Sequence, residues 1–185
     1  MNQSVETILT RRSVRSYRPD PIAETELTAI IDAGLYAPSA AGRQSRHLCV
    51  VVNPNIIDEI NTQLKQSSQL PGYDAYKFSV TSDDYAINFC NAPVFAIVSV
   101  ADGMPDADGA VMLENMFLAA HSLGLGSCWI NQLNPLSGEP GFRQLLTRLG
   151  VPQDYRVIGC GCFGHPDKAP PSPAPRKANA YCIVK

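Results

Sequence analysis

The chain of 185 residues has a formal net charge of −2, with 45% hydrophobic and 17% charged residues, the composition of a globular domain that can bury a core. Its pI near 5.9 provides no general attraction to nucleic acid or to an anionic membrane surface, so we expect neither as a partner. Because residues 1–10 lack the features of a secretion signal and the longest apolar run, 92–101, is too short to span a bilayer, we expect a cytoplasmic protein.

Apolar residues at helical or strand spacing predict alternating elements in the first half of the chain. In chain order these are a short helix around residues 5–9, a helix at 24–36, a strand at 47–52, and a helix that begins at 53–54 and continues to about residue 64. The second helix is expected to stop before Pro38, because proline disfavours helical backbone in the residue before it. Residues 66–84 include Pro71, Gly72 and several polar side chains, which predict an irregular insertion or a mobile loop, often a functional lid.

The second half begins with the clearest buried strand, at 94–100. The helix expected at 107–123 is apolar around most of its circumference, which places it in the core or at a subunit interface, and Gly124 is its expected C-cap. The remaining elements are a short strand or turn at 127–130, a helix at 142–149 capped by Gly150, and a strand at 155–162. Five prolines then predict an extended arm over 166–185, ending in a strand at 181–184 that needs an edge to pair with. The alternation of predicted helices and strands alone would indicate a doubly wound α/β fold.

The glycine pattern at 159–164 matches G-x-G-x-x-G and follows a predicted strand. A dinucleotide site requires this pattern to open a helix whose N-terminus receives the pyrophosphate. Here a proline-rich arm follows instead, so we expect these glycines to allow close backbone packing.

Two further patterns resemble metal sites without completing one. Cys160, Cys162 and His165 lack a fourth ligand at zinc-like spacing, and the six cysteines of a chain without a secretion signal are expected to be reduced thiols, mostly in the core. The run at Asp106 and Asp108 resembles part of a calcium loop, but its first and last ligand positions would be Met104 and Asn115, so the two aspartates are expected to act as acids at a helix N-terminus. We therefore expect no metal.

The segment 11–18, Arg-Arg-Ser-Val-Arg-Ser-Tyr-Arg, contains four arginines and two serines with no acidic residue. Arginine offers a fixed fork of donors suited to phosphate oxygens, and serine adds a short hydroxyl. The alternative is the solvated end of a helix, where the macrodipole favours each cation by ~0.3–1 kcal/mol. Arg43 and Arg46 also fall in the first quarter of the chain. In a chain of net charge −2, this clustering favours a small bound anion over a polyanion.

Four motifs in sequence order resemble the FMN-dependent nitroreductase family. They are the Arg-Arg-Ser-x-Arg core within 8–17, Ala-Pro-Ser at 37–39 followed by Gln44, the long apolar helix that runs into 124–130, and Arg176 after the proline-rich stretch. The resemblance covers nearly the whole chain and implies one α+β domain over 1–185, with a central, mostly antiparallel sheet flanked by helices. It also implies an intertwined homodimer in which the C-terminal arm 166–185 is exchanged and 181–184 pairs with the partner.

The resemblance implies that FMN binds at the dimer interface, with NADH or NADPH as reductant. Its binding residues would be Arg11, Arg12, Ser13 and Arg15 for the phosphate and nearby ribityl or ring atoms, Arg176 for the phosphate, Pro38, Ser39, Ala40, Gly42 and Gln44 from the other subunit, and Trp129, Ile130 and Asn131 against the ring. The flavin carries the chemistry, so no catalytic side chain is expected, and His47, His121 and His165 are interpreted as structural.

The chain departs from the family pattern in one motif. Gly42 stands where asparagine is usual, which removes a side-chain contact to the flavin, and Ser45-Arg46 replaces a common Pro-Trp. Arg43 and Arg46 add positive charge near this motif. The charge could favour an anionic acceptor, or the two side chains could simply be exposed to solvent.

Two functions remain open. The first is an NAD(P)H-dependent FMN oxidoreductase that reduces nitroaromatics, quinones or related small-molecule acceptors by ping-pong hydride transfer. The second is a flavin-binding or flavin-handling protein without robust reductase turnover.

Overall fold

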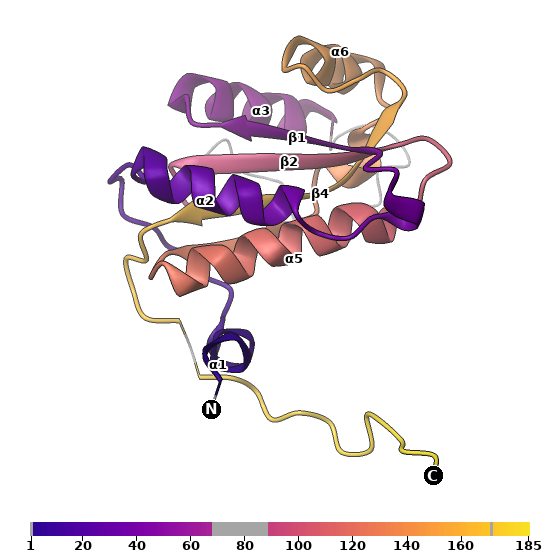
Figure 1. Ribbon diagram of the computed structural model, residues 1–185. Coiled ribbons are helices and arrows are strands. Elements are labelled where there is room, and N and C mark those ends of the chain that lie inside the picture. The colour runs from indigo at the N-terminus through magenta and orange to yellow at the C-terminus, as the bar shows by residue number, and fades with distance from the viewer. Residues whose placement is uncertain (1, 68–88, 171) are drawn as a thin grey trace.

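The computed structural model describes residues 2–67, 89–170 and 172–185. These form a four-stranded sheet in the order β1-β2-β4-β3, in which every neighbouring pair is antiparallel (Figure 1). The strands are β1 (Arg46–Val51), β2 (Val94–Ala101), β3 (Gly126–Ile130) and β4 (Tyr155–Gly164). The α+β class implied by the resemblance is confirmed. The doubly wound fold indicated by alternation is wrong, because that fold requires a mostly parallel sheet.

The helices agree with the predicted positions to within a few residues. They are α1 (Gln3–Thr10), α2 (Glu24–Leu35), α3 (Pro54–Ser67), α5 (Asp106–Ser122) and α6 (Pro140–Arg148), with short 3₁₀ turns η1 (Ala40–Gly42) and η2 (Asn134–Leu136). The loop predicted from residue 66 is wrong at its start, because α3 continues to Ser67. The Ser67 side chain is buried and its Oγ lies 3.3 Å from Gln63 Nε2. The rest of that predicted loop, 68–84, lies outside the described residues.

The sheet separates two hydrophobic cores. Helices α2 and α5 cover one face, and α3 and α6 cover the other (Figure 1). Because successive strand residues point to opposite faces, β2 supplies both cores: Ala96 and Val98 pack toward α5, whereas Phe95 and Ile97 pack toward α3 and α6. This explains why every residue of β2 except Ser99 is apolar.

Helix α5 leads directly into edge strand β3 through the predicted glycine cap. Gly124 has φ +77°, and Leu125 N donates to Ala120 O at 2.9 Å, as expected for a C-terminal cap in left-handed conformation. The turn brings β3 back alongside the sheet.

The glycines at 159–164 lie within β4 and allow close packing, as predicted. A Cβ on Gly161 would lie 2.9 Å from Phe117 Cε1, and one on Gly164 would lie 2.7 Å from Pro93 Cδ. No helix follows β4 in the described residues, so the nucleotide-loop interpretation is excluded.

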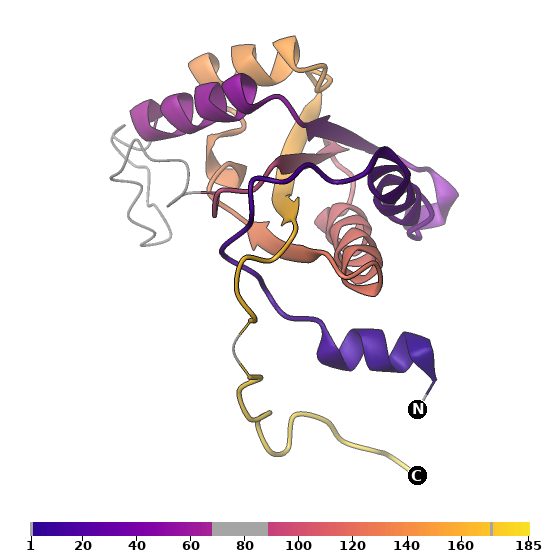
Figure 2. The same ribbon diagram turned by 90° about the vertical axis from the view of Figure 1, so that its left-hand side faces the viewer.

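Beyond the bridge at Pro166, the described part of the C-terminal arm contains neither helix nor strand and is exposed. Both chain ends lie on the α5 side of the sheet, away from α3 and α6 (Figure 2). The strand at 181–184 does not form within one chain, and its pairing with a partner stays a prediction. In the described ranges, no helix is long and apolar enough to cross a membrane.

Candidate functional site

The arginine-rich segment leaves α1 and runs along the outer edge of the sheet. Ser13 forms a parallel bridge with Ser127 of β3, and Val14 N donates to Ser127 O at 2.9 Å. Val14 and Tyr17 point into the core, whereas Arg15 is exposed. Because α1 ends at Thr10, the helix-end interpretation applies to Arg11 and Arg12 but not to the extended residues that follow.

The first two arginines are partly committed to contacts within the chain. Arg12 Nη1 donates to Leu9 O at 2.8 Å and to Arg11 O at 2.5 Å, so this guanidinium covers free carbonyls at the end of α1. Arg11 Nε lies 3.8 Å from Glu114 Oε1 on α5.

A histidine that sequence reasoning interpreted only as structural lies beside this cluster. His121 Nε2 is 2.9 Å from Thr10 Oγ1, at the junction of α1 and α5. Burial lowers the pKa of His121, and the charges of Arg11 and Arg12 lower it further. Its sequence signal is its position in the last turn of the helix that Gly124 ends. Segment 11–15 and the end of α5 therefore form one basic region.

Ser127 provides an independent sign of a missing partner. Its side chain is buried opposite Ser13, yet its Oγ has no hydrogen-bond partner among the described residues. A buried hydroxyl without a partner costs about 1–3 kcal/mol, so Ser127 Oγ is a candidate to hydrogen-bond a ligand that binds here.

Trp129 forms a flat, partly open surface next to this region. Its indole lies against the backbone of Gly159, where a Cβ would come within 2.2 Å of Trp129 Cζ2, and it packs edge-on against Phe117 at 6.3 Å between ring centroids. The side chain is 37% exposed, and its Nε1 donates to Asn131 Oδ1 at 3.3 Å. Ile130 points to the opposite face, into the core, so only its backbone can take part in a site here.

The second motif forms a separate hollow at the far end of α5. The hollow has a volume of 440 Å³ and is lined by residues 35–39, Gly42, Gln44 and Arg46. The Arg46 guanidinium hydrogen-bonds to three backbone carbonyls that line this hollow. Nη1 donates to Pro38 O at 2.8 Å, and Nη2 donates to Leu35 O at 3.1 Å and Ala37 O at 2.9 Å. These contacts cap the carbonyl end of α2, so Arg46 is a structural residue and neither earlier interpretation of its charge holds. Arg43 is exposed.

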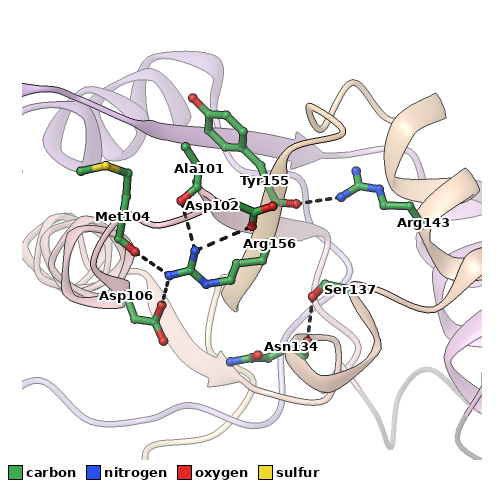
Figure 3. A network of polar contacts seen from close by, with 9 residues as sticks. All are labelled: Ala101, Asp102, Met104, Asp106, Asn134, Ser137, Arg143, Tyr155 and Arg156. Atoms are coloured by element: carbon green, nitrogen blue, oxygen red, sulfur yellow. Dashed lines mark hydrogen bonds and ion pairs between the residues drawn. The ribbon is translucent and has the colours of Figure 1, made fainter.

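A network around Arg156 of β4 holds the start of α5 and the turn that precedes it (Figure 3). Arg156 donates to Ala101 O at 3.1 Å and Asp106 Oδ1 at 2.5 Å, while Asp108 accepts the Ala40 amide. The helix-terminal acids are confirmed, but their long-range partners were not predicted. Nothing in the local pattern identifies Arg156 or its role.

The predicted site residues fall into three places in one chain. Ala40 contacts Asp108 in the first turn of α5, whereas the arginine segment lies beside His121 in the last turn. Asp108 and His121 are thirteen residues apart on α5, a separation of about 20 Å along the helix axis at 1.5 Å per residue. Arg176 lies on the exposed arm and makes no polar contact with the described residues. One chain therefore brings together segment 11–15, Ser127 and Trp129, but not the 38–44 loop.

The described side chains include no group of three metal-ligating residues placed to hold an ion. The chain thus offers a basic, hydroxyl-lined region beside an open aromatic surface, an arrangement suited to an anionic, flat aromatic ligand.

Comparison with known proteins identifies relatives over nearly the whole chain. Residues 8–165 match the model of the Nitroreductase family. A NADPH-flavin oxidoreductase of Vibrio harveyi is 31% identical over 176 residues, which cover 92% of this chain and 68% of that protein. A crystal structure of a nitroreductase with bound FMN from Bacteroides fragilis has a TM-score of 0.92 and 36% identity, with 100% of each chain covered. A nitroreductase with bound FMN from Desulfitobacterium hafniense shares the fold, with a TM-score of 0.83, 22% identity and 100% of each chain covered.

The resemblance drawn from the four motifs is confirmed by these matches. The family match extends from α1 to just beyond the end of β4. The chain therefore belongs to the nitroreductase family.

Proposed function

We propose that this protein is an FMN-dependent NAD(P)H oxidoreductase whose flavin sites are completed by a second copy of the chain. The observation that carries the proposal is the basic segment 11–15, which lies beside the unsatisfied Ser127 hydroxyl and the open face of Trp129. A similar protein is a NADPH-flavin oxidoreductase, and a solved relative that is 36% identical holds FMN. When bound, FMN supplies the capacity to accept and donate a hydride.

The residues present fit this cofactor. Arg11, Arg12 and Arg15 would hold the phosphate and nearby polar atoms, with Ser13 and Ser127 as hydroxyl partners. Charge-assisted hydrogen bonds of this kind are worth about 1.5–3 kcal/mol each. Trp129 would support the flat ring while the backbone of Ile130 and Asn131 donates to its polar edge.

The second copy would supply the 38–44 loop and Arg176, which one chain leaves far from its own basic segment. Exposed apolar side chains support such an assembly. They lie on α1 and at the end of α2: Val5, Ile8, Leu9, Leu35 and Tyr36, the last 90% exposed. A contiguous apolar patch of this kind usually marks an interaction surface. An intertwined homodimer would bury it, with an interface above ~2,000 Å² as in obligate pairs.

We propose that reductant and acceptor occupy the same position in turn. With one side of the flavin ring against Trp129, the two substrates would share the other side, so NADH or NADPH must leave before a nitroaromatic, quinone or related small molecule enters. Ping-pong kinetics follow from this order. The protein's residues then act by binding and orientation, without a side-chain nucleophile.

The alternative is a flavin-binding protein without robust turnover, and Gly42 favours it. A Cβ at this position would meet nothing within 4 Å, so the loop leaves open the space that the family's usual asparagine would enter. A weakened ring contact would spare binding through the arginines while reducing turnover.

The deciding experiment uses the purified yellow protein under anaerobic conditions. NADH or NADPH is added while flavin absorbance is recorded, and a quinone or nitroaromatic is then added to the same sample. Bleaching followed by return of the colour supports the reductase. Bound flavin that neither nucleotide bleaches would support the binding protein, and a protein that binds no FMN would refute both.

A further inference from the structure

An apolar hollow of 310 Å³ opens at one end of the sheet, where β1 ends and β2 begins. Four prolines line it: Pro19, Pro21, Pro54 and Pro93. It also includes the buried Ile22, from the core on the α2 side, and the buried Ile57, from the core on the α3 side. The hollow therefore lies between the two layers of the fold. Among the described residues that line it, none is charged.

The size and chemistry of this hollow suit an aromatic side chain. An apolar cavity of about 150 Å³ accommodates benzene, so 310 Å³ can hold one ring and a neighbouring aliphatic side chain. Proline and aromatic rings pack well together, as proline-rich peptides do on aromatic-lined grooves. Asn91 is the one polar side chain among the described lining residues, and it is exposed. It can hydrogen-bond a tyrosine hydroxyl, which such a ring keeps near water.

The C-terminal arm carries side chains of this kind that are exposed in the single chain. Tyr181 is 81% exposed and Ile183 is 72% exposed. In an extended chain, residues two apart point to the same side, so the two side chains can enter one hollow together. Residues 176–185 include three basic residues and no acidic one, whereas 19–27 and 52–59, which border the hollow, contain five acidic residues and no lysine or arginine. The arm and the hollow are therefore complementary in polarity and in charge.

The chain's own arm leads away from its own hollow. The first residues of the arm are fixed along segment 16–18: Arg18 N donates to His165 O at 2.9 Å, and Asp167 N donates to Ser16 O at 3.0 Å. The arm then passes α1 on the α5 side of the sheet (Figure 2). The arm that fills the hollow is therefore expected to come from a second copy of the chain.

The spacing of residues in the two segments supports this occupant. In the proposed dimer, Arg176 of one copy reaches the basic segment 11–15 of the other. Pro19, at the hollow, follows Arg15 by four residues without helix, and Tyr181 follows Arg176 by five. At about 3.3 Å per extended residue, these intervals are about 13 Å and about 17 Å. An arm that runs beside segment 11–19 in the same direction would thus bring Tyr181 to the hollow soon after Arg176 reaches the phosphate.

We propose that the hollow of each protomer receives the Tyr181 and Ile183 side chains of the partner's arm. The docking rests on the proposed function, because it uses the dimer in which Arg176 completes the partner's flavin site. It gives the exchanged arm an apolar attachment next to its charged one, and burial of the tyrosine ring makes the arm hold its position.

A cysteine at the hollow tests the contact, because Cys182 follows Tyr181 in the arm. Pro21, an exposed lining residue, is replaced by cysteine in the full chain, with its cofactor if bound, and the protein is treated with a short bis-maleimide. Trypsin then releases Cys182 in peptide 178–185 and position 21 in peptide 16–43, which has no other cysteine. Gel electrophoresis and mass spectrometry identify the product. Gln144→Cys, at an exposed position on α6, is the matched control.

We expect the Pro21→Cys protein to form a covalent dimer whose digest joins peptides 16–43 and 178–185. Cys182→Ser should abolish this product, and Gln144→Cys should not form a corresponding one. In the otherwise unchanged chain, Tyr181→Ala should raise the dimer dissociation constant about tenfold or more, because buried aromatic residues dominate interfaces. Tyr181→Phe keeps the ring and should leave the dissociation constant nearly unchanged.

Three results would overturn the docking. A dimer that holds FMN but forms no link, or equal dissociation constants for Tyr181→Ala and wild type, would leave the proposed assembly intact and refute only this contact. A product of monomer size that joins the same two peptides would assign the hollow to the chain's own arm. A wild-type protein that is monomeric would refute the assembly and the docking together.

Discussion

Asp108, in the first turn of α5, accepts a hydrogen bond from the backbone amide of Ala40, with both carboxylate oxygens 3.0 Å from the nitrogen. The two residues are 68 positions apart in the chain. The contact fixes the second motif at one end of α5, and the basic segment lies at the other. The helix thus keeps the two segments apart within one chain, which is why the proposed cofactor site takes its 38–44 loop from a second copy.

Removing this carboxylate should destabilise the fold. Asp108 is buried, and a hydrogen bond to a charged group is worth about 1.5–3 kcal/mol, so Asp108→Ala should lower the free energy of unfolding by that amount. Urea denaturation followed by circular dichroism measures it. Asp106→Ala removes an exposed partner of Arg156 and should cost about 1 kcal/mol or less. Equal losses in the two variants would contradict the assigned role.

The arginines of the basic segment should differ in their effects. Arg15 is exposed and makes no polar contact with the described side chains, so Arg15→Ala should weaken FMN binding by about 1.5–3 kcal/mol with little change in stability. Arg12→Ala should weaken FMN similarly and also loosen the end of α1, whose carbonyls Arg12 covers. Flavin fluorescence titration and thermal melts separate these effects. Arg18→Ala, which loses a surface pair with Asp20, is the control. Unchanged FMN affinity in both test variants would sink the assignment of this segment.

Restoring the family's usual residue at position 42 tests the departure in the second motif. Gly42 has φ +67° with open space around it, and asparagine tolerates this conformation better than most residues. We expect Gly42→Asn to tighten FMN binding or to shift its reduction potential. Gly42→Ala, which adds a side chain without an amide, is the control. If Asn and Gly proteins show the same affinity and potential, the site compensates elsewhere.

Deleting the arm from Pro173 onward should reduce dimerisation and FMN binding together. The deletion removes Arg176 and the exposed Tyr181 and Ile183, which require a partner surface. Sedimentation equilibrium and flavin content are measured on the same preparation. Arg176→Ala in the full chain removes the charge alone and should lower FMN content without dissociating the dimer. A truncated protein that remains dimeric and yellow at low concentration would refute arm exchange.

Stability should fall as the pH decreases below about 6.5. Burial lowers the pKa of His47 and His121 from 6.5, and Arg11 and Arg12 lower that of His121 further. Between the lowered pKa and 6.5 the unfolded chain binds more protons than the folded protein, so acid favours unfolding in that window. Urea titrations at several pH values give the slope, which His121→Gln should reduce. Equal slopes in wild type and in the His47→Gln and His121→Gln variants would contradict this account.

Local sequence patterns determined most helices and strands because their signals lie within a few residues. Pro38 and Gly124 marked helix ends through backbone restrictions that hold in any fold. The alternation of helices and strands did not reveal that the sheet is antiparallel, because the same succession of elements can also build a parallel sheet. The resemblance to the family supplied the mostly antiparallel sheet, and it implies that 11–15 and 37–44 are the segments that bind the proposed cofactor.

Tertiary structure alone decided which side chains are committed to structural contacts and which are open for a ligand. Arg46 and Arg15 carry the same charge in the sequence, but the fold directs Arg46 to three carbonyls of α2 and its following turn, and leaves Arg15 exposed. The contact between Asp108 and the Ala40 amide likewise joins residues that are 68 positions apart in the chain. The sequence determined the elements and the family, whereas the pairing of these distant groups required the packed sheet, because hydrogen bonds and burial between remote segments leave no periodic signal in the chain.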